Sequence, residues 1–275
     1  MTPDTDKAAR ELLAFYIEAG ADAAVGEEPV DRFADDLVAK PSVEPARAPQ
    51  PASSGPAEKL RASAPPLPIN APPSPDAATM TAREAVKGIA TLEDLRAALD
   101  AFDGCALKGT ATQLVFADGN PQAKLMIVGE APGRDEDIEG LPFVGRSGKL
   151  LDRMLAAIGL DRSGVYIANI IPWRPPGNRT PTPQESQICL PFIQRQIELV
   201  DPDILVCLGG PSAQTLLGIR DGITKARGRW LTYNTGKREI RAMATFHPEF
   251  LLRSPLQKRL AWRDFLAIKK ILQGN

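Results

Sequence analysis

The stretch that decides the fold is G-E-A-P-G-R-D-E-D-I-E-G-L-P-F-V-G-R-S-G, which runs from Gly129 to Gly148. It follows the apolar run 124–128 and leads into a helix-length segment over 148–158. A strand, a long loop with glycine and proline, and a helix in succession are typical of a site in an α/β protein, outside the carboxyl end of a strand. Ordinary connections of this kind have about 2–6 residues. The length of this loop therefore predicts a function for it.

Strand-like and helix-like segments alternate from this loop to the end of the chain. The predicted strands cover 124–128, 165–171, 204–208 and 240–246, and the predicted helices cover 91–102, 148–158, 183–199, 211–217 and 255–272. This alternation indicates an α/β fold, in which helices cover both faces of a mostly parallel sheet. We expect the loops at the carboxyl ends of the strands to meet, namely 129–147, 169–182, 209–212 and 247–254.

The bulk composition indicates a soluble, cytoplasmic protein without a membrane partner. The chain has 275 residues, of which 43% are hydrophobic, enough for one domain with a core and an additional segment. Its apolar runs stay well short of the roughly 18–20 residues that span a bilayer. The first residues lack the basic start and apolar stretch of a signal peptide.

Charge and composition divide the chain unequally. Residues 1–80 carry a net charge of −6, whereas the rest carries +5, which permits phosphate binding without establishing it. We predict a short N-terminal helical segment over 1–40, a Pro/Ala-rich disordered linker over 41–85 and a catalytic domain over 86–275. Apolar faces within 6–40 fit either an unidentified protein partner or a helical hairpin on its own domain.

Two side chains at strand ends are candidates for chemistry. Asn169 closes an apolar strand, where a buried amide suits reading a base edge but also suits a structural role. His247 is the only histidine and sits between a strand and a proline, so a neutral imidazole there can donate to a developing oxyanion. The glycine pattern of a P-loop is absent, which argues against a nucleoside triphosphatase.

Five motifs in one order carry a resemblance to a known family. They are G-E-A-P-G-R-D-E-D (129–137), G-L-P-F-V-G-R-S-G (140–148), V-Y-I-A-N (165–169), R-P-P-G-N-R-T-P-T-P (174–183) and H-P-E-F-L-L-R (247–253). The chain resembles the uracil-DNA glycosylase superfamily, most closely family 4. The resemblance implies a three-layer α/β/α sandwich on a four-stranded parallel sheet. It also implies hydrolysis of a flipped uracil from DNA during base excision repair, which leaves an abasic site. We expect a monomer that associates with the nucleoid through DNA.

The resemblance also implies roles for single residues. Phe143 would stack on the flipped uracil, Asn169 would pair with its Watson–Crick edge, and His247 would donate to its O2. Glu130 and Glu136 would be the loop carboxylates, and we favour Glu136 for positioning water or supporting the sugar cation. Further expected contacts are Ala131 with the base, and Arg146, Ser147, Arg174, Arg179, Leu252 and Arg253 with the DNA, with Leu251 beside Leu252 as an intercalating wedge.

The cysteines depart from the family pattern. Family 4 enzymes usually carry a [4Fe–4S] cluster on four cysteines. Cys105 and Cys189 match two of these positions, whereas Lys108 and Trp173 occupy the others. We therefore predict no cluster, no metal and no other cofactor, with Trp173 filling the space and Lys108 lying as a cation near the two thiols. We predict that Cys207, within an apolar strand, serves as a small buried apolar residue.

Two other classes of function remain open. A uracil- or abasic-DNA binding protein would capture its target without turnover. One branch of the superfamily does so through a histidine in an insertion after the second motif, and that loop has neither here. A non-catalytic scaffold would depend on the N-terminal segment, and the set of Glu136, Asn169 and His247 argues against it. Both alternatives predict that no free uracil is released.

Overall fold

A computed structural model describes residues 75–274 of the chain. Its helices are α2 (Pro75–Val86), α3 (Leu92–Ala101), α4 (Arg134–Glu139), α5 (Arg146–Ala157), α6 (Pro183–Val200), α7 (Gly210–Leu217), α8 (Ile223–Ala226), α9 (Pro248–Arg253) and α10 (Lys258–Leu272). Short 3-10 turns are η2 (Ala106–Thr110), η3 (Arg162–Gly164), η4 (Pro176–Asn178) and η5 (Pro255–Gln257). The strands are β1 (Asp118–Gly119), β2 (Leu125–Gly129), β3 (Tyr166–Asn169), β4 (Ile204–Leu208), β5 (Trp230–Asn234) and β6 (Glu239–Thr245).

The strands form one six-stranded sheet in the order β1-β3-β2-β4-β6-β5. The central strands β3, β2, β4 and β6 pair in parallel, and β1 and β5 add to the two edges in antiparallel orientation. The predicted α/β fold and its four parallel strands are confirmed. The predicted sheet size is corrected, because β1 has only two residues and β5 is half exposed, so neither gives a clear apolar pattern.

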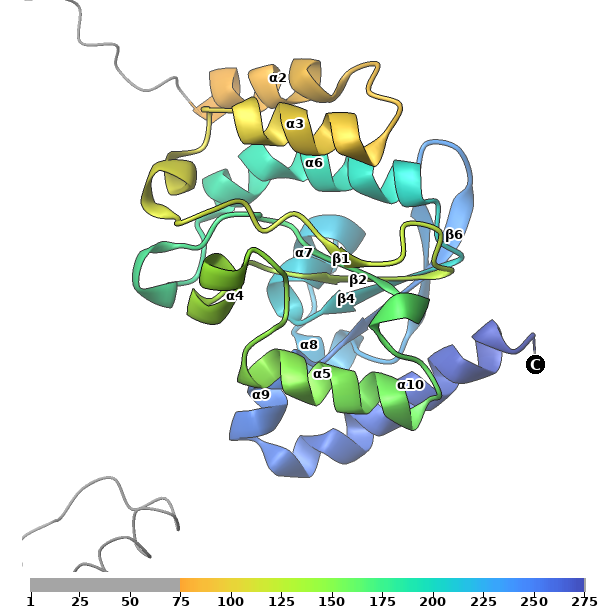
Figure 1. The fold of residues 1–275 in the computed structure, drawn as a ribbon. Coiled ribbons are helices and arrows are strands. Elements are labelled where there is room, and N and C mark those ends of the chain that lie inside the picture. The colour runs from red at the N-terminus through yellow and green to blue at the C-terminus, as the bar shows by residue number, and fades with distance from the viewer. Residues whose placement is uncertain (1–74, 275) are drawn as a thin grey trace, which may run out of the picture. The chain divides into compact units, whose positions relative to one another are not determined.

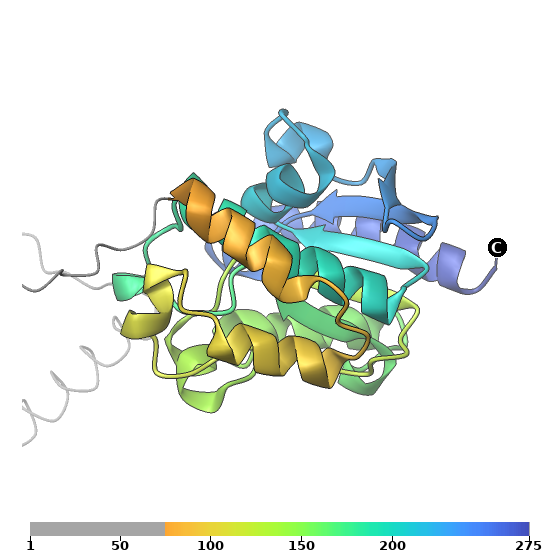
Figure 2. The ribbon, with the colours of Figure 1, turned by 90° about the horizontal axis from the view of Figure 1, so that it is seen from above.

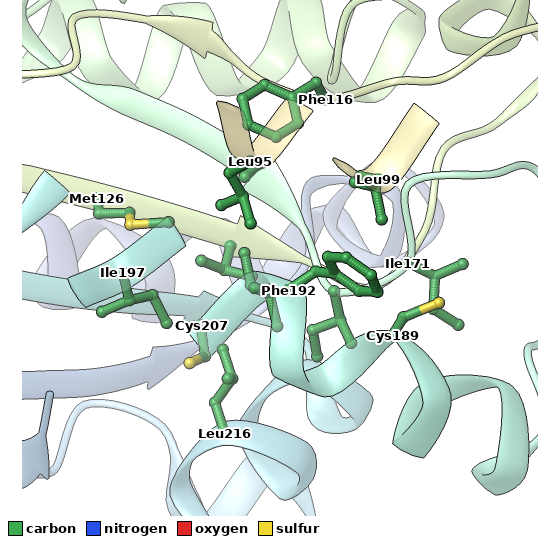
Figure 3. Packing of buried hydrophobic residues seen from close by; sticks show 14 of the residues in the cluster. Leu95, Leu99, Phe116, Met126, Ile171, Cys189, Phe192, Ile197, Cys207 and Leu216 are labelled. Carbon is green, nitrogen blue, oxygen red and sulfur yellow. The ribbon is translucent and has the colours of Figure 1, made fainter. Parts of the chain in front are cut away.

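Helices cover both faces of this sheet (Figure 1). On one face, α2, α3, α6 and α7 enclose a core that includes Cys189, Phe192, Cys207 and Leu216 (Figure 3). On the other face, α5 and α10 bury a second core with the opposite sides of the strands. The three-layer α/β/α arrangement is therefore confirmed.

The predicted linker is wrong at its C-terminal end. Residues 75–85 belong to α2, which lies alongside α6 (Figure 2) and buries Ala78 and Ala82 in the first core. A short helix of this kind takes its stability from tertiary packing, which Pro/Ala composition does not reveal. The rest of the linker and the helical segment predicted over 1–40 lie outside the described residues.

The end of the chain also differs from prediction. The helix expected over 255–272 is divided into η5 and α10, and Ser254 makes no side-chain capping bond there.

Within residues 75–274, the helices are too short or too polar to cross a membrane.

Candidate active site

A cleft of about 570 Å³ lies at the carboxyl ends of the parallel strands. Each of the four predicted loops contributes to its wall. The first loop contributes Glu130 and Phe143, and the second contributes Asn169 at its start. The third loop contributes Gly209, and the fourth contributes His247. The prediction that these loops meet at one edge of the sheet is confirmed.

Asn169 is held at the base of this cleft beside Gly129. The two residues are register partners at the ends of β3 and β2. A Cβ at position 129 would lie 2.4 Å from Asn169 Oδ1 and 2.6 Å from Cζ of Phe143, so a side chain there would displace both groups. Asn169 is 5% exposed, and its Oδ1 has no hydrogen-bond partner within residues 75–274. A buried acceptor without a partner is costly to stability, which makes this atom a candidate for binding a ligand.

Phe143 is buried beside this amide in a strained backbone conformation. Its φ of 56° lies in the left-handed region, which costs a residue with a side chain about 1–2 kcal/mol. The first turn of α5 closes over its carbonyl, since a Cβ on Gly148 would lie 1.6 Å from that oxygen. The Phe143 ring lies 5.4 Å from the His247 ring between centroids, with 32° between their planes. The two rings therefore border the same part of the cleft.

His247 is fixed in one tautomer by the helix that follows it. As the N-cap of α9, its Nδ1 accepts a hydrogen bond from the backbone N–H of Glu249 at 3.2 Å. In a neutral imidazole this leaves the proton on Nε2. Burial lowers the pKa of His247 from 6.5 to about 4. The side chain is thus a neutral hydrogen-bond donor at physiological pH.

The two loop carboxylates have different surroundings. Glu136 is buried, and its Oε2 accepts from the N–H of Gly133 at 3.1 Å. Its Oε1 accepts from the N–H groups of Val144 at 3.1 Å and Gly145 at 3.0 Å. Glu130 lines the cleft, and burial raises the pKa of its carboxyl group. Both carboxylates therefore line the cleft, but Glu136 also ties α4 to the approach of α5 through three backbone N–H groups.

The arginines predicted to contact DNA fall into two groups. Arg179 lines the cleft and donates to both carboxylate oxygens of Glu185, at 2.9 and 2.6 Å. Arg174 lies 3.9 Å from the buried carboxylate of Asp137, outside the cleft lining. Both guanidinium groups already have protein partners. Arg253 lines the cleft with a side chain that is 73% exposed and lies 3.9 Å from the carboxylate of Glu249, and Arg146 is exposed outside the lining.

The other residues predicted to contact DNA or the base also divide into those that line the cleft and those that do not. Ala131 and Ser147 line the cleft, whereas the partly buried Leu252 does not. Leu251 is 1% exposed and packs in a core cluster, so its assignment to an intercalating wedge is wrong. Phe246 and Phe250 were not among the predicted site residues. Both line the cleft, one before and one after His247 in the sequence, and their ring centroids lie 4.9 Å apart. A helical spacing rule could not have signalled the pair, because Phe246 precedes His247, the N-cap of α9.

The cysteine site does not fit an iron–sulfur cluster. The Sγ atoms of Cys105 and Cys189 lie 3.9 Å apart in the core, where Trp173 is also fully buried. The ammonium group of Lys108 lies 2.6 Å from the carboxylate of Asp103, and its predicted role as a cation near the two thiols stays a prediction. Within residues 75–274 there is no group of three or more His, Cys, Asp or Glu side chains that could hold a metal. Two thiols cannot replace the four ligands that such a cluster uses.

Comparisons with known proteins agree with this geometry. The model of the uracil DNA glycosylase superfamily matches residues 116–266. The type-4 uracil-DNA glycosylase of Archaeoglobus fulgidus is 38% identical over 185 residues, which cover 66% of this chain and 93% of the relative. That of Thermotoga maritima is 43% identical over 151 residues, covering 54% and 77%. That of Sulfurisphaera tokodaii is 37% identical over 186 residues, covering 66% and 84%. The chain therefore belongs to the uracil-DNA glycosylase superfamily.

Proposed function

We propose that this protein is a uracil-DNA glycosylase, which hydrolyses the N-glycosidic bond of deoxyuridine in DNA and leaves an abasic site. The observation that carries this function is Oδ1 of Asn169, which has no partner among the described residues and is buried in a cleft that the Phe143 ring and the His247 imidazole also border. The names of its relatives support the same substrate.

Asn169 suits the Watson–Crick edge of uracil. Uracil presents an N3–H donor beside an O4 acceptor, and the amide of Asn169 presents an acceptor beside a donor. Cytosine presents the opposite pair, so it would leave the buried amide unpaired. Sites built to bond a polar edge reject such analogues strongly. Phe143 supplies an aromatic face for the base once it has left the DNA stack.

His247 and Glu130 suit the two centres of charge in the reaction. As the C1′–N1 bond breaks, its electron pair moves onto the uracil ring, and Nε2–H of His247 donates to the developing charge on O2. A water molecule adds its oxygen to C1′, and its proton is released. Glu136 already accepts three backbone hydrogen bonds, which occupy its carboxylate oxygens. We therefore assign the orientation of this water, or the stabilisation of the sugar cation, to Glu130.

DNA containing uracil is the proposed partner, and several surface groups suit its backbone. Arg253 and Ser147 lie at the cleft and the exposed Arg146 lies outside it, which supports assigning them to phosphate contacts. Leu252, next to Arg253, remains the proposed wedge for the gap that a flipped nucleotide leaves. We further propose a monomer that acts in the cytoplasm on nucleoid DNA.

Release of free uracil tests this function. The full chain would be incubated with single- and double-stranded oligonucleotides that contain one deoxyuridine, with matched thymidine and deoxycytidine strands as controls. Free uracil and an alkali-labile site are expected only with the deoxyuridine strands. Tight binding to these strands without release would instead show a capturing protein.

The pH dependence of the single-turnover rate tests the state of His247. Because the pKa of His247 is lowered to about 4, its neutral donor form persists as the pH falls through 6.5. We expect no loss of rate at pH 6.5 that originates from this residue. Stability behaves differently: the unfolded histidine takes up a proton below about 6.5, so stability falls between pH 6.5 and about 4.

Two variants identify which side chain causes any loss of rate at acidic pH. Because the pKa of Glu130 is raised, we expect protonation of its carboxyl group to cause this loss, and Glu130→Gln should then remove the pH dependence. A decline centred near pH 6.5 that survives Glu130→Gln but disappears in His247→Asn would contradict the neutral-donor assignment.

Iron analysis tests the proposed absence of a cluster. We expect freshly purified protein, handled without oxygen, to contain no stoichiometric iron or acid-labile sulfide, because two of the four ligand positions hold Trp173 and Lys108. Its absorption spectrum should show only the aromatic band. Stoichiometric iron that is lost in a Cys189→Ser variant would overturn this proposal.

A further inference from the structure

Arg162 forms a cluster of contacts behind the cleft that the proposed mechanism does not use. Its Nη1 donates to the carbonyl of Pro142 at 3.1 Å, and its Nη2 donates to the carbonyl of Phe143. The guanidinium is held from the other side by Asp152 on α5, 2.9 Å from Nε, and by Asp118 on β1. One side chain thus joins η3, α5, β1 and the loop that carries the base-stacking ring.

The carbonyls that Arg162 binds are the two that bracket the strained residue. The Pro142 carbonyl belongs to the peptide bond before Phe143, and the other carbonyl is that of Phe143 itself, whose φ is 56°. A guanidinium presents its donors in a rigid planar fork, so it fixes the directions of both peptide groups. The backbone of Phe143 sets the direction of its Cα–Cβ bond, and therefore the point from which its ring extends into the cleft.

The short strand β1 has a role in this arrangement. Only two residues pair with β3, and Gly119 approaches the backbone so closely that a Cβ would lie 2.1 Å from the carbonyl oxygen of Val165. This pairing brings Asp118 to the guanidinium of Arg162, where its side chain is 25% exposed. The edge strand β1 therefore holds the carboxylate of Asp118 where it orients the guanidinium of Arg162.

We infer that Arg162 is a positioning residue for base recognition, which holds the backbone of Phe143 so that its ring can stack on the flipped base. This inference rests on the proposed function and deepens it. Arg162 does not line the cleft, so its effect on the reaction is transmitted through Phe143.

Arg238 offers a matched control at the opposite end of the sheet. Its Nη2 donates to the carbonyls of Asp201 at 2.9 Å and Pro202 at 3.1 Å. It also pairs with the carboxylates of Asp201 and Asp203. Asp201 has a φ of 47°, so Arg238 likewise clamps a left-handed residue. That clamp lies just before the amino end of β4, away from the cleft.

The experiment compares Arg162→Met with Arg238→Met in the full chain, at a temperature where both variants are folded. Both are expected to lower the melting temperature. Only Arg162→Met is expected to lower kcat/KM for uracil excision, by about 10- to 100-fold, since small misplacements of a binding group have effects of this size. It should also weaken inhibition by free uracil, which reports on the base pocket without DNA.

A double variant separates positioning from general stability. In a Phe143→Ala background the ring is gone, so adding Arg162→Met should cause no further loss of kcat/KM. If Arg162→Met does not fold, Asp118→Asn replaces it, since it loosens the same guanidinium and leaves both carbonyl contacts possible. Equal activity of the Arg162 and Arg238 variants, or a loss that persists in full without the ring, would overturn the inference alone. A wild type that releases no uracil would overturn the proposed function and the inference with it.

Discussion

Replacing Asn169 with alanine is expected to lower uracil excision by about 100-fold, the effect of losing a bidentate contact to a base edge. The same change should shift the melting temperature by less than about 2 °C. The reason is that Oδ1 of Asn169 has no hydrogen-bond partner among the described residues, so the free protein loses no bond to that atom. Single-turnover rates and a thermal melt check both parts.

A second buried amide provides the contrast. Gln196 is 4% exposed, donates to the hydroxyl of Tyr166 at 2.7 Å and does not line the cleft. Gln196→Ala should therefore lower stability and leave uracil excision intact. If Asn169→Ala loses as much stability as Gln196→Ala and keeps its activity, Asn169 is a structural residue and the base-reading assignment fails.

Replacing His247 with alanine is expected to lower the rate of the chemical step by about 10²–10³-fold, as for the loss of one donor to a developing oxyanion. It should also lower the free energy of unfolding by about 1 kcal/mol, because the N-cap of α9 is lost. Single-turnover kinetics with saturating enzyme measure the first effect, and denaturant unfolding measures the second.

His247→Asn separates these two effects. Asparagine is a good N-cap, so it can still accept from the N–H of Glu249 and keep α9 capped. Its shorter side chain does not carry a donor to where Nε2 lies. The asparagine variant should thus have near wild-type stability and the low activity of the alanine variant. Wild-type activity in His247→Asn would show that capping is the role of this histidine.

The position of the site was predictable from the sequence, because it follows from topology. Parallel strands end at the same edge of a sheet, so residues at or just after the strand ends, such as Asn169 and His247, had to come together there. The approach of Gly129 to Asn169 was not predictable, because it depends on the register between β2 and β3. Register is set by the packing of both faces of the sheet rather than by a local pattern.

The internal structure of the long loop was not predictable either. Helix α4 has six residues, too few for a periodic signal, and the side chain of Glu136 closes its start by folding back to Gly133. The sequence could not distinguish the roles of Glu130 and Glu136, because both are acids of one loop and only burial and backbone partners separate them. The left-handed backbone of Phe143 depends on Gly148 and Arg162, which no local rule connects to it.

Asn169, Phe143 and His247 are proposed to form one pocket for a flipped uracil. The most direct test of this pocket is the release of free uracil from a deoxyuridine oligonucleotide by the wild type, Asn169→Ala and His247→Asn, measured at equal folded concentration. We predict release by the wild type, with a loss of about 100-fold or more in each variant. Wild-type rates in both variants, or no release by the wild type, would contradict it.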